Sequence, residues 1–115
     1  MKKVSLAFIF SSILSVLVLL SVCLFWRNSL LLTGLLIIIS AVMIGMGKNK
    51  EDFYLYIVIF FIGATAEAIG VASGAWSYTL PDIIGIPFWL PFVWGNAGIM
   101  SKRIYLEIHC LRPNS

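Results

Sequence analysis

The stretch FYLYIVIFFIGATAEAIGVASGA, residues 53–75, decides the fold class because it is long enough and apolar enough to cross a membrane. A transmembrane helix needs about 20 predominantly apolar residues to span the hydrocarbon core of a bilayer. This run exceeds that length, and its only charged residue is Glu67. We therefore predict a transmembrane helix that carries a carboxyl group for which a partner must be found.

The composition extends this interpretation to the whole chain. Of its 115 residues, 61% are hydrophobic and 11% are charged, which leaves too few polar side chains to cover a water-soluble globule. A chain of this length has room for four membrane spans with short connections and no separate soluble domain. We predict one membrane domain, 1–115, of the all-α class: a polytopic four-helix transmembrane bundle.

Polar segments and prolines divide the chain into these four spans. The segments RN at 27–28 and KNKED at 48–52 interrupt the apolar pattern. Proline is accepted at the first position of a helix, so the fourth helix is expected to begin at Pro87, with a proline interruption and kink at Pro91. The predicted helices cover about 4–26, 29–47, 53–75 and 87–109, with an outer loop at 76–86.

The positions of the basic residues predict the orientation of the chain. If the N-terminus is cytoplasmic, seven of the eight Lys and Arg residues lie inside and only Arg27 lies outside, as the positive-inside rule requires. The seven are Lys2, Lys3, Lys48, Lys50, Lys102, Arg103 and Arg112. They form no continuous basic patch, so we expect no nucleic-acid partner. The sequence predicts a multi-pass cell-membrane protein, of a bacterial inner membrane, with both termini cytoplasmic.

Small residues in the third predicted helix indicate how it packs. Gly63, Gly70 and Gly74 share one stripe with Glu67, because residues three and four apart lie on the same helix face. In lipid, helices associate where small residues let backbones approach closely. We expect these glycines to pack helices together, the third helix to be the central one, and Glu67 to lie in a groove between helices.

Glu67 has two interpretations. An ionised carboxylate in hydrocarbon is costly unless it is paired, hydrated or protonated, so an intramembrane acid is by default a functional residue. It would act as a catalytic general acid or base, a proton carrier or a cation binder. The alternative is a structural carboxyl group that locks helices together through hydrogen bonds to Ser73, Tyr78, Asn96 or an indole.

Several aromatic and polar residues are expected at the depth of Glu67. An aromatic pocket with a carboxylate suits a cationic or polyene-like ligand. The candidate binding residues are Trp76, Tyr78, Asp82, Trp89, Trp94 and Asn96. We expect no metal and no cofactor, because the single histidine, His109, lies in the tail and the sequence has neither zinc-ligand spacing nor a nucleotide-binding glycine loop.

Two spaced motifs lie within residues 63–95. The first, E-x-x-G-x-x-x-G-x-x-x-Y, runs from Glu67 to Tyr78, and the second, G-x-P-x-x-x-P-x-x-W, lies in GIPFWLPFVWG at 85–95. Together they resemble the pattern of integral membrane carotenoid-biosynthesis proteins, over roughly the second half of the chain. Members of that family usually have more spans. The resemblance implies action on a long polyene isoprenoid, such as hydration or cyclisation.

A shorter motif, AEAIG at 66–70, contains the same glutamate. It resembles the A-E-x-x-G around the essential membrane glutamate of small multidrug resistance transporters, which are also four-helix proteins. In that family the glutamate belongs to the first helix, whereas here it belongs to the third. This resemblance implies proton-coupled export of hydrophobic cations by a dimer.

Three functions therefore remain open from the sequence. The first is an enzyme or binder that handles a hydrophobic lipid- or isoprenoid-like molecule at an aromatic cleft beside Glu67. The second is a proton-coupled exporter of the small multidrug type. The third is a non-catalytic subunit of a membrane complex. The expected partners are membrane lipids, a hydrophobic small molecule, and either a second copy of the chain or a larger membrane protein.

Overall fold

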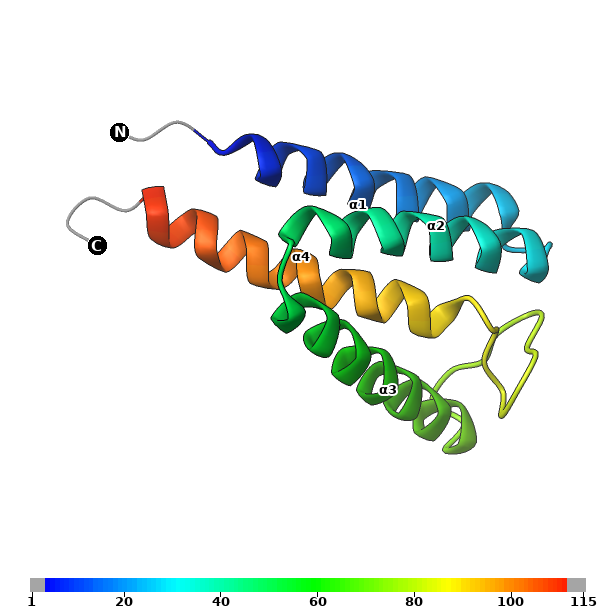
Figure 1. Ribbon diagram of the computed structural model, residues 1–115. Coiled ribbons are helices and arrows are strands. Elements are labelled where there is room, and N and C mark those ends of the chain that lie inside the picture. The colour runs from blue at the N-terminus through cyan, green and yellow to red at the C-terminus, as the bar shows by residue number, and fades with distance from the viewer. Residues whose placement is uncertain (1–3, 112–115) are drawn as a thin grey trace.

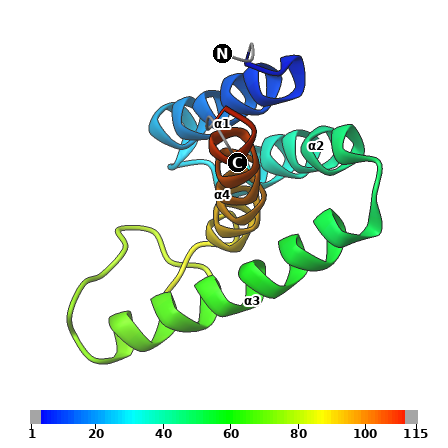
Figure 2. The ribbon, with the colours of Figure 1, turned by 90° about the vertical axis from the view of Figure 1, so that its left-hand side faces the viewer.

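The computed structural model describes residues 4–111 and contains four α-helices in one bundle (Figures 1 and 2). The helices are α1 (Leu6–Phe25), α2 (Ser29–Gly47), α3 (Lys50–Ala72) and α4 (Leu90–Leu111). Within the described residues there is no strand, and an isolated bridge joins Ile83 to Ile86. The all-α prediction is confirmed. The predicted orientation also used Lys2, Lys3 and Arg112, and these three residues lie outside the described residues.

Side-chain caps set the beginnings of the first three helices. Each helix follows a Ser or Asn whose side-chain oxygen accepts a backbone N–H from the first turn, and these caps are Ser5, Asn28 and Asn49. Such a cap contributes about 1 kcal/mol relative to alanine. Because Asn49 caps α3, this helix begins at Lys50, before the predicted start at Phe53.

Three of the four helices, α1, α2 and α3, are long and apolar enough to cross a membrane. Their outer faces expose large apolar side chains such as Leu24, Leu30 and Phe61. Exposure of such side chains is unfavourable in water and favourable in lipid. The prediction of a membrane protein with transmembrane helices is confirmed to this extent. The fourth helix differs from the others because its second half carries Lys102, Arg103 and Glu107.

α4, not α3, is the central helix. It packs against each of the other three helices, whereas α3 packs mainly against α4 and meets α2 at few positions (Figure 2). The expectation that the third helix is central is therefore wrong. The physical reason is that α4 carries the polar and charged side chains that need partners, while the three apolar helices can turn their outer faces to lipid.

α4 begins three residues later than predicted. The backbone N–H of Leu90 donates to the carbonyl oxygen of Pro87 at 3.3 Å, which forms a turn ahead of the helix. Pro91 then lies in the first helical turn, where a missing N–H removes no helical hydrogen bond. The helix runs without a break from Leu90 to Leu111, so the predicted proline interruption is wrong.

An ionic network joins all four helices at the end of the bundle where α2 turns into α3. The Asp52 side chain of α3, in a residue only 2% exposed, accepts hydrogen bonds from Lys102 Nζ at 2.5 Å and Arg103 Nη2 at 3.0 Å. Arg103 also donates to Ser11 Oγ of α1 at 2.8 Å and to the carbonyl oxygen of Met43 in α2 at 2.6 Å. One guanidinium group thus connects α4 to its three neighbours.

A second contact at this end brings the start of α1 to the last turns of α4. The backbone N–H of Ser5 donates to Glu107 Oε1 at 2.6 Å, and Glu107 is buried. The beginning of α1 and the end of α4 consequently lie at the same end of the bundle, opposite the connection between α3 and α4 (Figure 1). An even number of passes through the bundle produces this arrangement.

We expect Asp52→Asn to destabilise the bundle strongly, because Lys102 and Arg103 would remain partly buried without their anionic partner. Removing one member of a buried ion pair typically costs about 3–5 kcal/mol. The free energy of unfolding in mixed detergent micelles measures the effect. The matched control is Glu51→Gln, which changes an exposed carboxylate in the same helical turn and should cost less than about 1 kcal/mol. Equal losses in the two variants would contradict the network.

Candidate functional site

The carboxylate of Glu67 accepts three hydrogen bonds from aromatic side chains. Tyr78 Oη donates to Oε2 at 2.6 Å, and Trp76 Nε1 donates to the same oxygen at 2.9 Å. Trp94 Nε1 donates to Oε1 at 3.3 Å. Glu67 lies on α3, Trp94 lies on α4, and the other two residues belong to the connection at 73–89. The carboxylate therefore joins two helices and a loop.

The end of α3 explains how Trp76 and Tyr78 reach Glu67. The N–H of Ala75 donates to the carbonyl of Gly70, and the N–H of Gly74 donates to the carbonyl of Val71, both at 3.0 Å. These two bonds, with Gly74 at φ +84°, form a Schellman motif, which favours glycine at the left-handed position. The motif turns the chain back along the last turns of α3, where Glu67 lies.

Gly63 and Gly70 provide the space for the two indole rings. A Cβ atom on Gly70 would overlap the ring of Trp76, and one on Gly63 would overlap the ring of Trp94. Gly63 thus lies at the contact between α3 and α4, but it faces a side chain and not a second backbone. Gly70 faces the connection. Gly74, expected on the same packing stripe, lies beyond the helix in the turn. A Cβ atom added at this position would have no atom within 4 Å, so Gly74 packs against no other helix.

All three partners of Glu67 are hydrogen-bond donors. An indole N–H can only donate, and burial raises the pKa of the Tyr78 phenol well above its usual value, with a further increase from the hydrogen bond to Glu67 and from its charge. The phenol therefore keeps its proton at neutral pH. Glu67 acts as an acceptor toward each partner, and of the about four acceptor positions of a carboxylate one, on Oε1, is left for another donor or a cation unless one of the three partners is released.

Three of the sequence-predicted site residues, Asp82, Trp89 and Asn96, lie outside this cluster, and the first two belong to the connection at 73–89. Asp82 Oδ2 accepts hydrogen bonds from Ser29 Oγ at 2.5 Å and from the backbone N–H of Phe88 at 3.0 Å, so it holds the connection against the start of α2. Trp89 is buried in the hydrophobic core with Leu32 and Leu36 of α2. Both residues order the connection that supplies Trp76 and Tyr78.

Asn96 belongs to a second polar cluster, inside the bundle. Its Nδ2 donates to Ser40 Oγ of α2 at 2.8 Å and to the carbonyl oxygen of Phe92 at 3.0 Å. Ser40 Oγ lies 2.5 Å from Tyr56 Oη of α3, so the cluster joins α2, α3 and α4. Sequence analysis did not identify this group, although polar residues inside apolar spans are the signal that could have found it. Within residues 4–111, no group of three or more His, Cys, Asp or Glu side chains could hold a metal ion.

Comparison with known proteins gives no match: no family model, no curated protein and no solved structure is similar to this chain. The class that the fold itself defines is a helical protein with three helices of membrane-spanning length. The resemblances to carotenoid-biosynthesis proteins and to small multidrug resistance transporters stay predictions.

We expect Gly63→Ala to destabilise the protein by about 1–3 kcal/mol, because the added methyl group must displace the Trp94 ring from α3. The control is Gly34→Ala in α2, where no atom lies within 4 Å of the new Cβ and the higher helix propensity of alanine should be neutral or stabilising. Unfolding in mixed micelles separates the two variants. A Gly63→Ala protein as stable as Gly34→Ala would contradict the close packing of the Trp94 indole against Gly63.

Proposed function

We propose that this chain is a multi-pass membrane protein, of a bacterial inner membrane, that binds a hydrophobic lipid- or isoprenoid-like molecule beside Glu67. The observation that carries the proposal is the convergence of three aromatic donors on a carboxylate of an apolar helix. One of these donors, Trp76, is 47% exposed. It is therefore the donor that an incoming molecule can most readily replace.

The proposed topology has α4 as a fourth span and both termini on the cytoplasmic side. Lys48 and Lys50 flank the turn between α2 and α3, at the same end of the bundle as Lys102 and Arg103. Arg27 lies at the other end, with its guanidinium carbon 5.0 Å from the centre of the Trp26 ring. This distribution supports the orientation given by the positive-inside rule. Pairing of Lys102 and Arg103 with Asp52 lowers the cost of placing the charged half of α4 near lipid.

Replacement of Trp76 would free part of Glu67 Oε2 for a ligand. The ring faces of Trp76, Tyr78 and Trp94 would then provide apolar and π contacts, and the carboxylate would accept a hydrogen bond or hold a positive charge. Tyr78 keeps its proton next to this carboxylate. In the enzymatic form of the proposal, Glu67 accepts or supplies a proton during the reaction of a polyene, with Tyr78 holding the carboxylate in place.

A second candidate is a non-catalytic subunit of a larger membrane complex. It is favoured by the observation that both oxygens of Glu67 are already hydrogen-bonded within the chain. In this case the carboxylate only fixes the connection against α3 and α4. The two candidates differ in whether the loss of charge at Glu67 changes the molecules bound to the protein.

We expect Glu67→Gln to reduce the amount of co-purified lipid-like molecule by about tenfold or more, since a hydrogen bond to a charged group contributes about 1.5–3 kcal/mol. Native mass spectrometry of the protein released from nanodiscs measures the bound mass. Glu51→Gln, an exposed change on the same helix, should retain the wild-type occupancy.

Two results would overturn this proposal. If folded Glu67→Gln protein retains the same bound molecules as the wild type, the carboxylate is a structural lock and the subunit function is favoured. If the wild type carries no such molecule and instead exports ethidium in a manner that depends on Glu67, the protein is an exporter of hydrophobic cations.

A further inference from the structure

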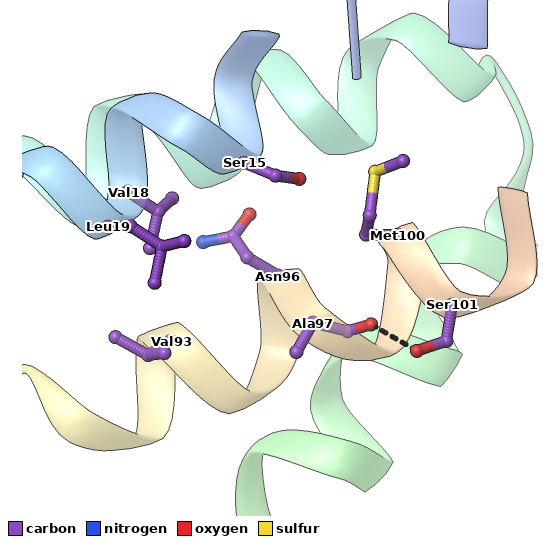
Figure 3. Close-up of a pocket in the computed structure, with 8 residues that line it drawn as sticks. All are labelled: Ser15, Val18, Leu19, Val93, Asn96, Ala97, Met100 and Ser101. Atoms are coloured by element: carbon purple, nitrogen blue, oxygen red, sulfur yellow. Dashed lines mark hydrogen bonds between the residues drawn. The ribbon is translucent and has the colours of Figure 1, made fainter. Parts of the chain in front are cut away.

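A cavity of about 260 Å³ lies between α1 and α4, away from the residues that surround Glu67 (Figure 3). Val18 of α1 and Val93 of α4 form part of its apolar wall, and Ala97 lies at its exposed side. Ser15 and Asn96 face it from opposite helices. The cavity is thus a mainly apolar space with a few polar atoms at defined positions, which is the usual construction of a ligand site.

Asn96 lines this cavity and carries a buried acceptor without a partner in the described part of the chain. The residue is 3% exposed, and its Nδ2 uses its two hydrogens on Ser40 Oγ and on the carbonyl oxygen of Phe92. A carbonyl can only accept, so the contact with Phe92 sets which end of the amide is nitrogen. Oδ1 has no hydrogen-bond partner among residues 4–111, and Figure 3 shows it pointing toward α1 on the side of Ser15. Leaving a buried acceptor unpaired is unfavourable, which favours an occupant that supplies a donor.

The other polar side chains around the cavity also have no free hydrogen to offer. Ser15 Oγ donates to the carbonyl oxygen of Ser11 at 2.9 Å, and Ser101 Oγ donates to the carbonyl oxygen of Ala97 at 2.8 Å. Both hydrogens of Asn96 Nδ2 are already used. The cavity therefore selects a molecule whose polar group donates a hydrogen bond, such as a hydroxyl, over one whose polar group is a carbonyl or an ether.

The position and size of the cavity restrict the rest of the molecule. Ser15 lies near the middle of α1, and Asn96 lies in the apolar half of α4, before its charged residues. In a membrane this is the hydrocarbon interior, which a charged phospholipid head group does not enter readily. The volume is slightly below the range of about 300–1,000 Å³ typical of sites that enclose a drug-sized ligand, so only one end of a long molecule fits.

We infer that the cavity between α1 and α4 binds the hydroxyl end of an uncharged long-chain alcohol, whose O–H donates to Asn96 Oδ1. The hydrocarbon tail leaves the cavity past Ala97 and lies in the lipid along α1 and α4. This inference rests on the membrane location in the proposed function. It requires neither Glu67 nor the aromatic residues that bind it.

The experiment measures the binding of tritiated farnesol, a long-chain alcohol, to the full chain in nanodiscs. The competitor is farnesyl methyl ether, which keeps the chain and the oxygen but lacks the donor hydrogen. We expect saturable farnesol binding and a competitor about fivefold weaker or more, the ratio that corresponds to one ordinary hydrogen bond. Equal competition by farnesol and its ether, or the absence of saturable binding, would overturn the inference and leave only water as the partner of Asn96.

Matched variants distinguish this site from the rest of the protein. Ala97→Phe fills the cavity from its exposed side without altering the hydrogen bonds of Asn96, and it should lower farnesol affinity by about tenfold or more. Ala41→Phe places the same ring on an exposed position of α2 and should have no effect. Loss of farnesol binding in Glu67→Gln, together with unchanged affinity in Ala97→Phe, would place the alcohol at Glu67 and overturn the inference. Unchanged affinity in Ala97→Phe, with thermal stability equal to that of the wild type, would overturn the assignment.

Discussion

In an apolar solvent a polar side chain must find its partner within the protein, and α4 carries several that reach partners on the other three helices. Arg103 reaches groups of α1, α2 and α3 from a single position. Asn96 reaches α2 through Ser40 and, through it, Tyr56 of α3. Because these partners come from three directions, α4 must lie between the other helices. The helices that carry few polar groups can then occupy the outer positions, where their apolar side chains contact lipid and need no hydrogen-bond partner.

The same constraint organises the end of the bundle around Glu67. The acid lies on α3, whose only extensive packing partner is α4, so the connection at 73–89 supplies the remaining donors. The Schellman turn at Gly74 directs Trp76 and Tyr78 back to α3, and the missing side chain at Gly70 lets the Trp76 indole pack closely against the helix. The three aromatic donors around Glu67 are paired with its carboxylate, whereas Thr33 Oγ1 of α2 and Asn96 Oδ1, deeper in the bundle, are unpaired among the described residues.

Much of this fold could be predicted because apolar runs and their interruptions are local properties. The predicted bounds of the second helix, 29–47, are those of α2, and the four helices occur in the predicted order. The grouping of Glu67 with Trp76, Tyr78 and Trp94 was also predictable from their common depth. Sequence spacing does not reveal how each helix is rotated. Prediction from spacing therefore placed Asn96 beside Glu67 and missed the partners of Asp52. It also treated the glycine stripe of α3 as a contact between backbones, whereas indole rings pack against Gly63 and Gly70.

The account depends on our proposal that α4 crosses the membrane beside the three apolar helices. Its most direct test is labelling with a membrane-impermeant maleimide in whole cells, in a background with Cys23→Ser and Cys110→Ser. Ser77→Cys reports on the connection between α3 and α4, and His109→Cys reports on the last turns of α4. We predict that Ser77→Cys is labelled from outside and that His109→Cys is labelled only after the membrane is permeabilised. Labelling of both positions from the same side would show that α4 does not cross, and would contradict the account.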